Sequence, residues 1–162
     1  MKPKVLIIVG SDSDIPVMEE AGKVLKDFNI PFDMTIASAH RSPERVLKIA
    51  TGAEKRGIEV IIAGAGMSAH LAGVIASHTI LPVIGVPLSS SPLSGFDSLL
   101  SMVQMPGGVP VAVMSLGKAG ARNAGIFAVQ ILSRKDLFLE KKLHAFKNKQ
   151  AKQVEEKAKG LR

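Results

Sequence analysis

The segment Ile36-Ala-Ser-Ala-His-Arg-Ser-Pro-Glu44 combines an imidazole, a guanidinium and two hydroxyls within nine residues. The guanidinium of Arg41 can grip a phosphate through its planar fork, and Ser38 can add a neutral donor. Imidazole titrates near neutral pH, so His40 can exchange a proton there. A lone histidine is more often structural, but its place between two anion-binding residues predicts a general acid or base beside a phosphate site.

A second polar turn, Gly10-Ser-Asp-Ser-Asp14, follows the first apolar run of the chain. Its backbone N–H groups and the hydroxyl of Ser11 face a predicted helix N-terminus, where the helix dipole favours a phosphate. Two carboxylates would repel that phosphate, so we expect at least one to point elsewhere. Asp14 either caps the following helix or accepts hydrogen bonds from ribose hydroxyls, and Asp12 is structural. A capped helix without a ligand also fits this turn.

A third turn, Gly64-Ala-Gly-Met-Ser-Ala-His-Leu-Ala-Gly73, is rich in small residues. It contains G-x-G but lacks the spacing and the place of the dinucleotide fingerprint. It favours instead a close-packed wall against a flat ligand, with backbone donors toward a ligand carboxylate. His70 either points into the site or locks the turn, and the sequence favours the locking role. The candidate binding residues here are Gly66, Ser68, His70 and Leu71.

Other chemistries find little support in the sequence. His78 lies at a predicted helix end and His144 in a charged tail, and neither has partners at metal-ligand spacing, so no metal site is expected. The chain has no cysteine, no G-x-x-x-x-G-K-[ST] loop and no G-x-S-x-G elbow. These absences argue against thiolate chemistry, ATP consumption and serine hydrolysis.

Short, often β-branched apolar runs alternate with helix-like segments along the chain, which is typical of buried parallel strands and their crossover helices. We expect strands at 5–9, 34–37, 60–63, 83–86 and 111–114. We expect helices at 15–28, 43–55, 69–77, 95–102 and 119–132, the first two capped by Asp14 and Ser42, with Gly57 shortly after the second.

Five βα units predict a three-layer, flavodoxin-like α/β fold with a parallel five-stranded sheet and an additional C-terminal helix. We assign residues 1–133 to the catalytic domain and 134–162 to a basic helical tail of that domain. The tail has apolar positions only at its start, so we expect it to dock there and then to fray or to meet a neighbouring subunit. Two loops, 89–94 and 105–110, are rich in small residues and proline and suit close approach to a ligand or a closing lid.

The charge and hydropathy of the chain limit its partners. Of 162 residues 46% are apolar, enough for one substantial core, yet no apolar run reaches the ~20 residues of a membrane span. The net charge of +7 is concentrated after residue 133, where ten Lys and Arg face four Asp and Glu. Without Trp or Tyr there is no basic and aromatic surface for stacking bases. We therefore expect a cytoplasmic protein with no nucleic-acid or membrane partner.

Six segments in register resemble the bacterial 5-(carboxyamino)imidazole ribonucleotide mutase family of purine biosynthesis. The resemblance runs from about Val5 to Leu132, and the segments are Gly10-Ser-Asp-Ser-Asp14, Ser38-Ala-His-Arg41, Gly64-Ala-Gly…Ala69-His-Leu71, Leu93-Ser-Gly…Asp97-Ser-Leu99, Gln104-Met-Pro…Gly108 and Gly117-Lys-Ala-Gly120. The resemblance implies a homo-octamer of flavodoxin-like subunits with sites at subunit contacts. It also implies an isomerase that moves a carboxylate from the exocyclic nitrogen to the ring carbon of aminoimidazole ribonucleotide, without cofactor, metal or ATP.

Carried over by position, the resemblance makes His40 the catalytic histidine, a proton shuttle during transfer of the carboxylate through CO2. It assigns the substrate phosphate to Ser11, Ser38 and Arg41, and the ribose hydroxyls to Asp14. The chain departs from the family pattern in Gly66-Met-Ser-Ala-His-Leu-Ala-Gly73, where the family usually has Gly-Gly-Ala-Ala-His-Leu-Pro-Gly. His70-Leu71 favours the mutase over the related direct carboxylase.

Three other functions compete with the mutase. The nearest is carboxylation of aminoimidazole ribonucleotide by free CO2. A second is a non-catalytic phosphate- or nucleotide-binding module, because a fold alone does not fix function. The weakest is association with nucleic acid through the basic tail.

Overall fold

The structure, a computed structural model, describes residues 2–161. Its strands are β1 (Val5–Val9), β2 (Phe32–Ile36), β3 (Val60–Gly66), β4 (Val83–Leu88) and β5 (Ala112–Val113). Its α-helices are α1 (Ile15–Asp27), α2 (Pro43–Gly52), α3 (Leu71–Ala76), α4 (Phe96–Val103), α5 (Gly117–Ser133) and α6 (Leu137–Lys159). Two short 3₁₀ helices, η1 (Asp12–Asp14) and η2 (Glu54–Arg56), precede α1 and follow α2.

Within residues 2–161 the five strands form one parallel sheet in the order β2-β1-β3-β4-β5. This is the flavodoxin-like order, and the predicted fold class is confirmed. The chain moves from β1 outward to β2 and then returns to β3 on the other side of β1. The strand order therefore reverses between β1 and β3, which makes this place the topological switch point of the sheet. Open α/β sheets bind ligands at the carboxyl ends of the strands beside a switch point.

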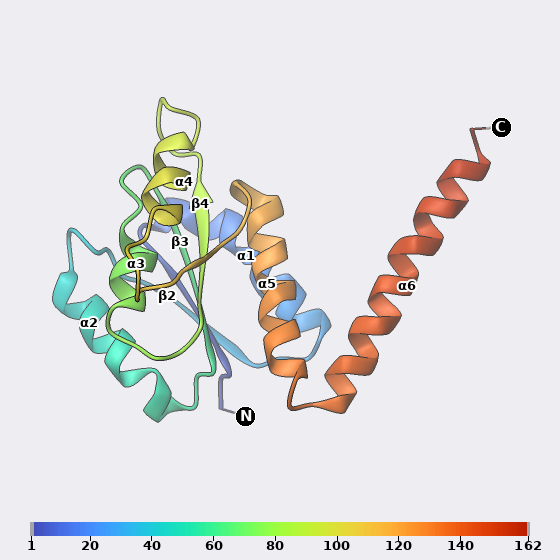
Figure 1. The fold of residues 1–162 in the computed structure, drawn as a ribbon, viewed down its shortest axis with the longest axis horizontal. Coiled ribbons are helices and arrows are strands. Elements are labelled where there is room, and N and C mark those ends of the chain that lie inside the picture. The colour runs from blue at the N-terminus through green and yellow to red at the C-terminus, as the bar shows by residue number, and fades with distance from the viewer. Residues whose placement is uncertain (1, 162) are drawn as a thin grey trace.

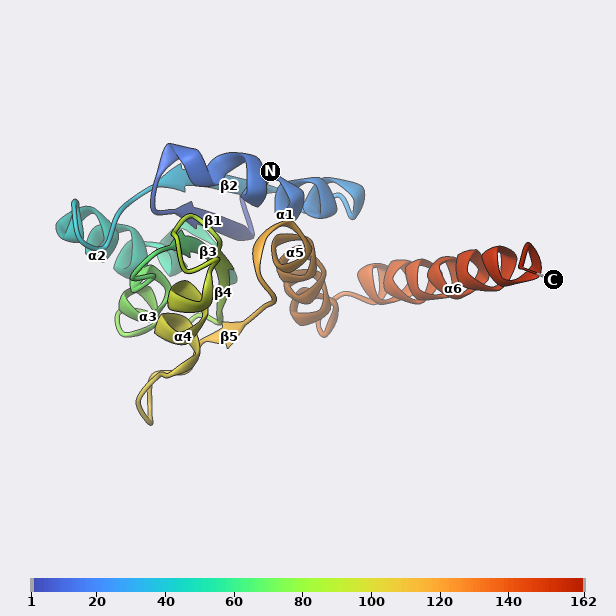
Figure 2. The ribbon, with the colours of Figure 1, turned by 90° about the horizontal axis from the view of Figure 1, so that it is seen from above.

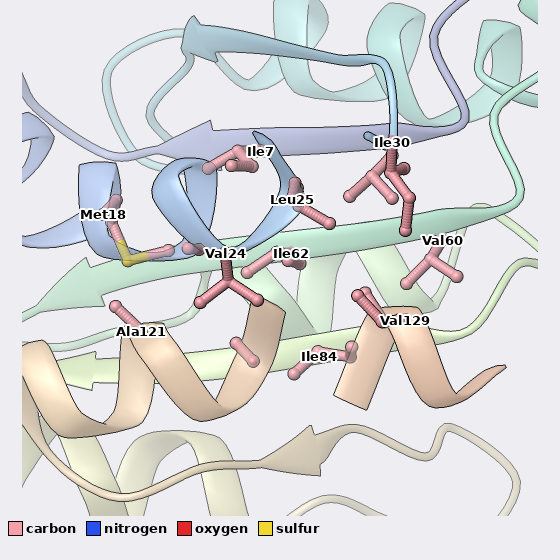
Figure 3. Packing of buried hydrophobic residues seen from close by; sticks show 14 of the residues in the cluster. Ile7, Met18, Val24, Leu25, Ile30, Val60, Ile62, Ile84, Ala121 and Val129 are labelled. Carbon is pink, nitrogen blue, oxygen red and sulfur yellow. The ribbon is translucent and has the colours of Figure 1, made fainter. Parts of the chain in front are cut away.

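The central strand β1 is buried on both faces, which makes the sheet the middle of three layers. Val5, Ile7 and Val9 pack in one hydrophobic cluster with α1 and α5, and Leu6 and Ile8 pack in a second cluster with α2 and α3. Figure 1 shows α2 and α3 on the opposite side of the sheet from α1 and α5, and Figure 2 shows the same layers from above. In Figure 3 isoleucines of three neighbouring strands face α1 and α5, namely Ile7, Ile62 and Ile84.

Helices α1 and α5 approach closely because Gly125 faces the backbone of α1. A Cβ atom at Gly125 would lie 2.9 Å from the carbonyl oxygen of Ala21. The small side chains Ala121, Ala124 and Ala128 of α5 are fully buried. Helices α1 and α5, which cover the same face of the sheet, thus meet through glycine and alanine.

Several predicted boundaries differ from those observed. The strand predicted at 34–37 is wrong by two residues, because Phe32 and Asp33 also pair with β1. The helix predicted at 43–55 ends at Gly52 and continues only as the 3₁₀ turn η2, which Gly57 closes with φ of 90°. The strand predicted at 111–114 is only two residues long and lies at the edge of the sheet.

Helix α6 docks through its first turns and then leaves the body of the molecule. Asp136 Oδ1 caps it by accepting from the backbone N–H groups of Phe138 and Leu139, at 2.9 and 3.2 Å. Leu143 is buried, and the ring of Phe146 meets that of Phe28 edge-on with centroids 5.8 Å apart. Docking at the start of the tail is therefore confirmed. Fraying is wrong, because the helix continues unbroken to Lys159 and projects away from the sheet (Figure 1).

No helix within residues 2–161 combines the length and the apolar character needed to cross a membrane.

Candidate active site

Turns that follow four neighbouring strands converge on one pocket of about 610 Å³ at the carboxyl edge of the sheet. The turns after β1, β2 and β3 contribute most of its wall, and the loop after β4 adds one residue. The pocket lining consists of Gly10, Ser11, Ser13, Asp14, Ser38, Ala39, His40, Arg41, Ala65, Gly66, Met67, Ser68, His70, Leu71 and Ser90. All nine candidate residues predicted from the sequence are therefore brought together.

The turn after β1 separates its two carboxylates. Asp14 is only 6% exposed, and its Oδ2 accepts a hydrogen bond of 3.1 Å from the backbone N–H of Ser11. Asp12 is exposed, does not line the pocket, and accepts from the Ser11 hydroxyl at 2.8 Å. The expectation that one carboxylate points elsewhere is confirmed. Asp14 occupies the N-cap position of α1, but its side chain bonds back to Ser11 and makes no capping bond to the helix.

The two carboxylates also differ in their acidity. Burial raises the pKa of Asp14 above its ordinary value, although the Ser11 N–H and the Arg41 charge act in the opposite direction. The hydroxyl of Ser11, together with backbone N–H groups, lowers the pKa of Asp12. Asp14 is therefore the carboxylate that is held inside the pocket at an electrostatic cost.

Arg41 connects the turn after β2 to the turn after β1. Its Nη2 donates to the carbonyl oxygen of Gly10 at 2.8 Å, and its Nε donates to Ser38 Oγ at 3.4 Å. The backbone N–H of Arg41 also donates to Ser38 Oγ, at 3.2 Å. These bonds hold the guanidinium in the pocket wall and leave some of its five N–H groups free to donate to an anion.

Ser42 is the N-cap residue of α2, as predicted, but its side chain closes the preceding turn and makes no capping bond to the helix. Its hydroxyl accepts from the backbone N–H of Ser38 at 3.0 Å and donates to the carbonyl oxygen of Ser38 at 3.2 Å. The side chain makes no bond to the first turn of the helix. A closed loop of five residues therefore presents Ser38, His40 and Arg41 together.

The turn after β3 forms the opposite wall. Met67 adopts φ of 55°, in the left-handed region that a long side chain rarely occupies, and its side chain is 59% exposed. Gly66 faces Ser90 so closely that a Cβ atom there would collide with the Ser90 hydroxyl. Leu71 is buried beneath the pocket as the first residue of α3. The departures Met67 and Ser68 thus lie in the wall of the pocket.

His40 and His70 meet across the pocket. His40 Nε2 lies 2.8 Å from His70 Nδ1, and the rings are nearly perpendicular, with an interplanar angle of 82°. His70 points into the site, so the predicted role of locking its own turn does not describe its side chain. His78 and His144 lie outside the pocket lining.

Sequence reasoning missed Ser90 as a pocket residue, whereas Ser13 belongs to the predicted turn Gly10–Asp14. Ser90 belongs to the loop 89–94, whose small residues and proline were its only local signal. The second loop of that kind, 105–110, contributes nothing to the pocket of its own chain, and Met105 packs instead against Gly73 of α3. Among residues 2–161 there is no cluster of three or more His, Asp or Glu side chains arranged to hold a metal.

The fold and the pocket define a doubly wound α/β protein whose pocket is lined by Arg41 and a histidine pair. The sequence model of one family, described as AIR carboxylase, matches residues 4–153. The chain belongs to this family, and the resemblance found in its motifs is confirmed.

Relatives named N5-carboxyaminoimidazole ribonucleotide mutase extend over nearly the whole chain. The protein of Pyrococcus horikoshii is 55% identical over 160 residues, which cover 99% of this chain and 89% of that one. The protein of Bacillus subtilis is 56% identical over 143 residues, which cover 88% of each chain. The crystal structure of Treponema denticola PurE has a TM-score of 0.87 at 26% identity and covers 99% of both chains.

A longer relative carries a different name. Phosphoribosylaminoimidazole carboxylase of Saccharomyces cerevisiae is 52% identical over 161 residues, which cover 99% of this chain but 28% of that protein.

Proposed function

We propose that this protein is a cofactor-independent isomerase of de novo purine biosynthesis. It converts 5-carboxyamino-1-(5-phosphoribosyl)imidazole to 5-amino-1-(5-phosphoribosyl)imidazole-4-carboxylate. The names of relatives that match it over most of their length support this reaction. The observation that carries the proposal is the placement of His40 in one pocket with Arg41, so that a proton shuttle stands beside a phosphate-binding group.

The phosphate end of the substrate binds between the turns after β1 and β2. Arg41 supplies charged donors and the Ser38 hydroxyl a neutral one, and the Ser11 hydroxyl joins them by turning from Asp12 to the phosphate. Asp14 accepts hydrogen bonds from the ribose hydroxyls through Oδ1, because its Oδ2 accepts from the backbone N–H of Ser11. This order places the charged phosphate near the guanidinium and leaves the imidazole ring of the substrate to face His40.

The turn after β3 encloses the reacting end of the substrate. Gly66, Ser68, His70 and Leu71 form a wall of mostly small groups that holds CO2 and excludes water. Met67 of the same turn also lines the pocket and is largely exposed. A closed wall matters because CO2 released into water would be lost to the second half of the reaction.

His40 moves one proton during the transfer. It donates this proton to the exocyclic nitrogen as the N–C bond of the carbamate breaks and CO2 leaves. The ring carbon then attacks CO2 with its enamine-like electron pair, which forms the new C–C bond. His40 finally takes the proton from that carbon, so atoms and charge balance without a cofactor.

The assembly is a homo-octamer in this proposal. Helix α4 exposes Phe96, Leu100 and Val103, each more than half accessible, along with Leu93 before it. Beside them, a buried carboxylate oxygen, Asp97 Oδ1, has no hydrogen-bond partner among the described residues. An apolar face with an unsatisfied acceptor fits a contact between subunits. The projecting part of α6 offers a further contact.

We place the reaction in the cytoplasm, with no nucleic-acid or membrane partner. The substrate is a charged phosphate ester, and charged groups cross bilayers at high cost. An enzyme that consumes it therefore works in the compartment in which it is made.

The two enzyme functions are separated by supplying the purified protein with each substrate in turn. We expect rapid conversion of the carbamate ribonucleotide, and conversion of aminoimidazole ribonucleotide only at high bicarbonate. The yeast relative named as a carboxylase makes this comparison necessary. Efficient use of low bicarbonate would favour the carboxylase, and conversion of neither substrate would leave a binding module.

A further inference from the structure

The two histidines of the pocket are joined by a direct hydrogen bond that has no role in the reaction steps proposed above. His40 Nε2 and His70 Nδ1 lie 2.8 Å apart, although the residues are 30 positions apart in the chain. The contact occupies one nitrogen of each ring. His40 therefore has only Nδ1 free to exchange a proton with a ligand while this bond persists.

His70 is the better anchored member of the pair. Its backbone N–H donates to the carbonyl oxygen of Ser68 at 2.8 Å, and its own carbonyl oxygen accepts from Val74 at 2.9 Å at the start of α3. The main chain of His40 lies instead in the loop between β2 and α2. A ring fixed at a helix start can thus set the orientation of a ring carried by a loop.

The protonation states of a shuttle histidine determine which ring donates in the bond between His40 and His70. A shuttle histidine alternates between a neutral ring and a cation, and in the cation both ring nitrogens carry protons. If His70 donated to His40 Nε2, the cation of His40 would place two N–H groups against each other. If His70 Nδ1 accepts, the same bond survives in both states. An accepting His70 also fixes neutral His40 with its proton on Nε2 and its lone pair on Nδ1.

We propose that His70 is a positioning residue for His40. It accepts from His40 Nε2, fixes the tautomer of the neutral ring and aims Nδ1 at the reacting atoms of the substrate. This inference rests on the proposed isomerase function for its kinetic consequence, whereas the tautomer can be measured without any reaction.

Two substitutions of His70 separate positioning from packing. His70→Leu removes the acceptor, and His70→Asn keeps an amide oxygen in its place. We expect His70→Leu to lower kcat by about 10- to 100-fold, by analogy with the loss seen when the partner that orients a metal-bound histidine is removed. We expect His70→Asn to recover most of that loss, and in both variants we expect KM for the ribonucleotide to change less than kcat. His78→Leu, outside the pocket, is the matched control.

The tautomer is measured by ¹⁵N NMR of histidine-labelled protein above neutral pH, with the His40 signals assigned from His40→Asn. We expect the proton on Nε2 in the wild type and in His70→Asn, and a mixture of tautomers in His70→Leu. An unchanged tautomer in His70→Leu, or equal kcat loss in both His70 variants, would overturn the positioning role. If the wild type converts no substrate, the isomerase proposal fails while the NMR result still decides the tautomer.

Discussion

At the scale of single residues, the pocket depends on side chains that hold the turns as well as facing the ligand. Arg41 bonds to Gly10 in one turn and to Ser38 in another, so a single guanidinium links the two loops that are proposed to bind the phosphate. Asp14 holds the backbone of Ser11 in the same way. Loss of either side chain should therefore change both binding and the geometry of the empty pocket.

Replacing Arg41 with Met should weaken binding of the ribonucleotide product by roughly 10- to 100-fold, because a charge-assisted hydrogen bond contributes about 1.5–3 kcal/mol. Isothermal titration calorimetry measures this loss. Arg45→Met is the matched control, since Arg45 bonds to Ile36 and Thr35 outside the pocket lining. Equal affinities for Arg41→Met and the wild type would remove Arg41 from the phosphate site.

Replacing Asp14 with Asn should shift the pH dependence of stability. Burial raises the pKa of Asp14 in the folded state above its unfolded value. The folded state therefore binds more protons between those two values, and stability falls as pH rises through this window. Asp14→Asn removes that fall, so its unfolding free energy relative to wild type should increase from acidic to neutral pH.

Denaturant titrations at several pH values test this prediction. Asp12→Asn provides a control of opposite sign, because the pKa of Asp12 is lowered and its stabilisation is lost as pH falls. A relative stability of Asp14→Asn that decreases toward neutral pH would show that Asp14 is stabilised as a carboxylate.

At the scale of elements, the local pattern predicted the strands and crossover helices better than their ends. The continuous apolar run of β1 has the predicted bounds, because both faces of a central parallel strand are buried. Strand β2 lies next to β1 at the edge of the sheet and begins with Phe32 and Asp33. Because Asp33 is polar, the apolar pattern did not indicate that the strand begins there. The ends of a strand depend on the neighbouring strand with which it pairs, and the local hydrophobic pattern carries no information about that neighbour.

Part of the candidate site was predictable from the order of strands and turns along the chain. The carboxyl ends of parallel strands lie at the same edge of the sheet. The turns after the neighbouring strands β1, β2 and β3 were therefore expected to lie close together. The contact between Gly66 and Ser90 was not predictable, because the loop after β4 reaches the third turn through tertiary packing. The His40–His70 bond likewise joins two separate loops and leaves no spacing signal in the sequence.

Replacing Gly125 with Ala tests the contact between α1 and α5. The added methyl group would meet the Ala21 carbonyl oxygen at 2.9 Å, so one helix must shift. We expect a loss of about 1–3 kcal/mol in the free energy of unfolding, as for overpacked cores. Urea denaturation measures it, with Gly107→Ala as control because nothing lies within 4 Å of that position. Similar stability of the two variants would contradict the close contact.

At the scale of the whole molecule, the exposed apolar face of α4 and the projecting α6 lie far apart on the surface (Figure 2). A single chain leaves both uncovered, whereas a closed assembly of identical chains can cover them. The loop 105–110 projects from the body beside α4 in the same view and makes no contribution to its own pocket. In the proposed assembly these segments form the contacts between subunits.

Replacing Leu100 with Glu should break the proposed assembly. The side chain is 56% exposed in the single chain, so the substitution costs little there but places a charge in the subunit contact. We expect light scattering to give eight times the 17.1 kDa chain mass for the wild type and a smaller species for the variant. Ile80→Glu, at a position 86% exposed between α3 and β4, should keep the wild-type mass. A wild-type monomer, or an unchanged mass for Leu100→Glu, would contradict this contact.

The central claim is that the carboxylate moves within one closed pocket under the control of His40. It is tested most directly with carbamate ribonucleotide labelled with ¹³C in its carboxylate, mixed with protein in excess unlabelled bicarbonate, and corrected by an enzyme-free sample. We predict that the product keeps most of the label, and that His40→Asn lowers turnover by about 10²- to 10⁴-fold while product binding persists. A product carrying unlabelled carboxylate, or a His40→Asn variant with near-normal turnover, would contradict the account.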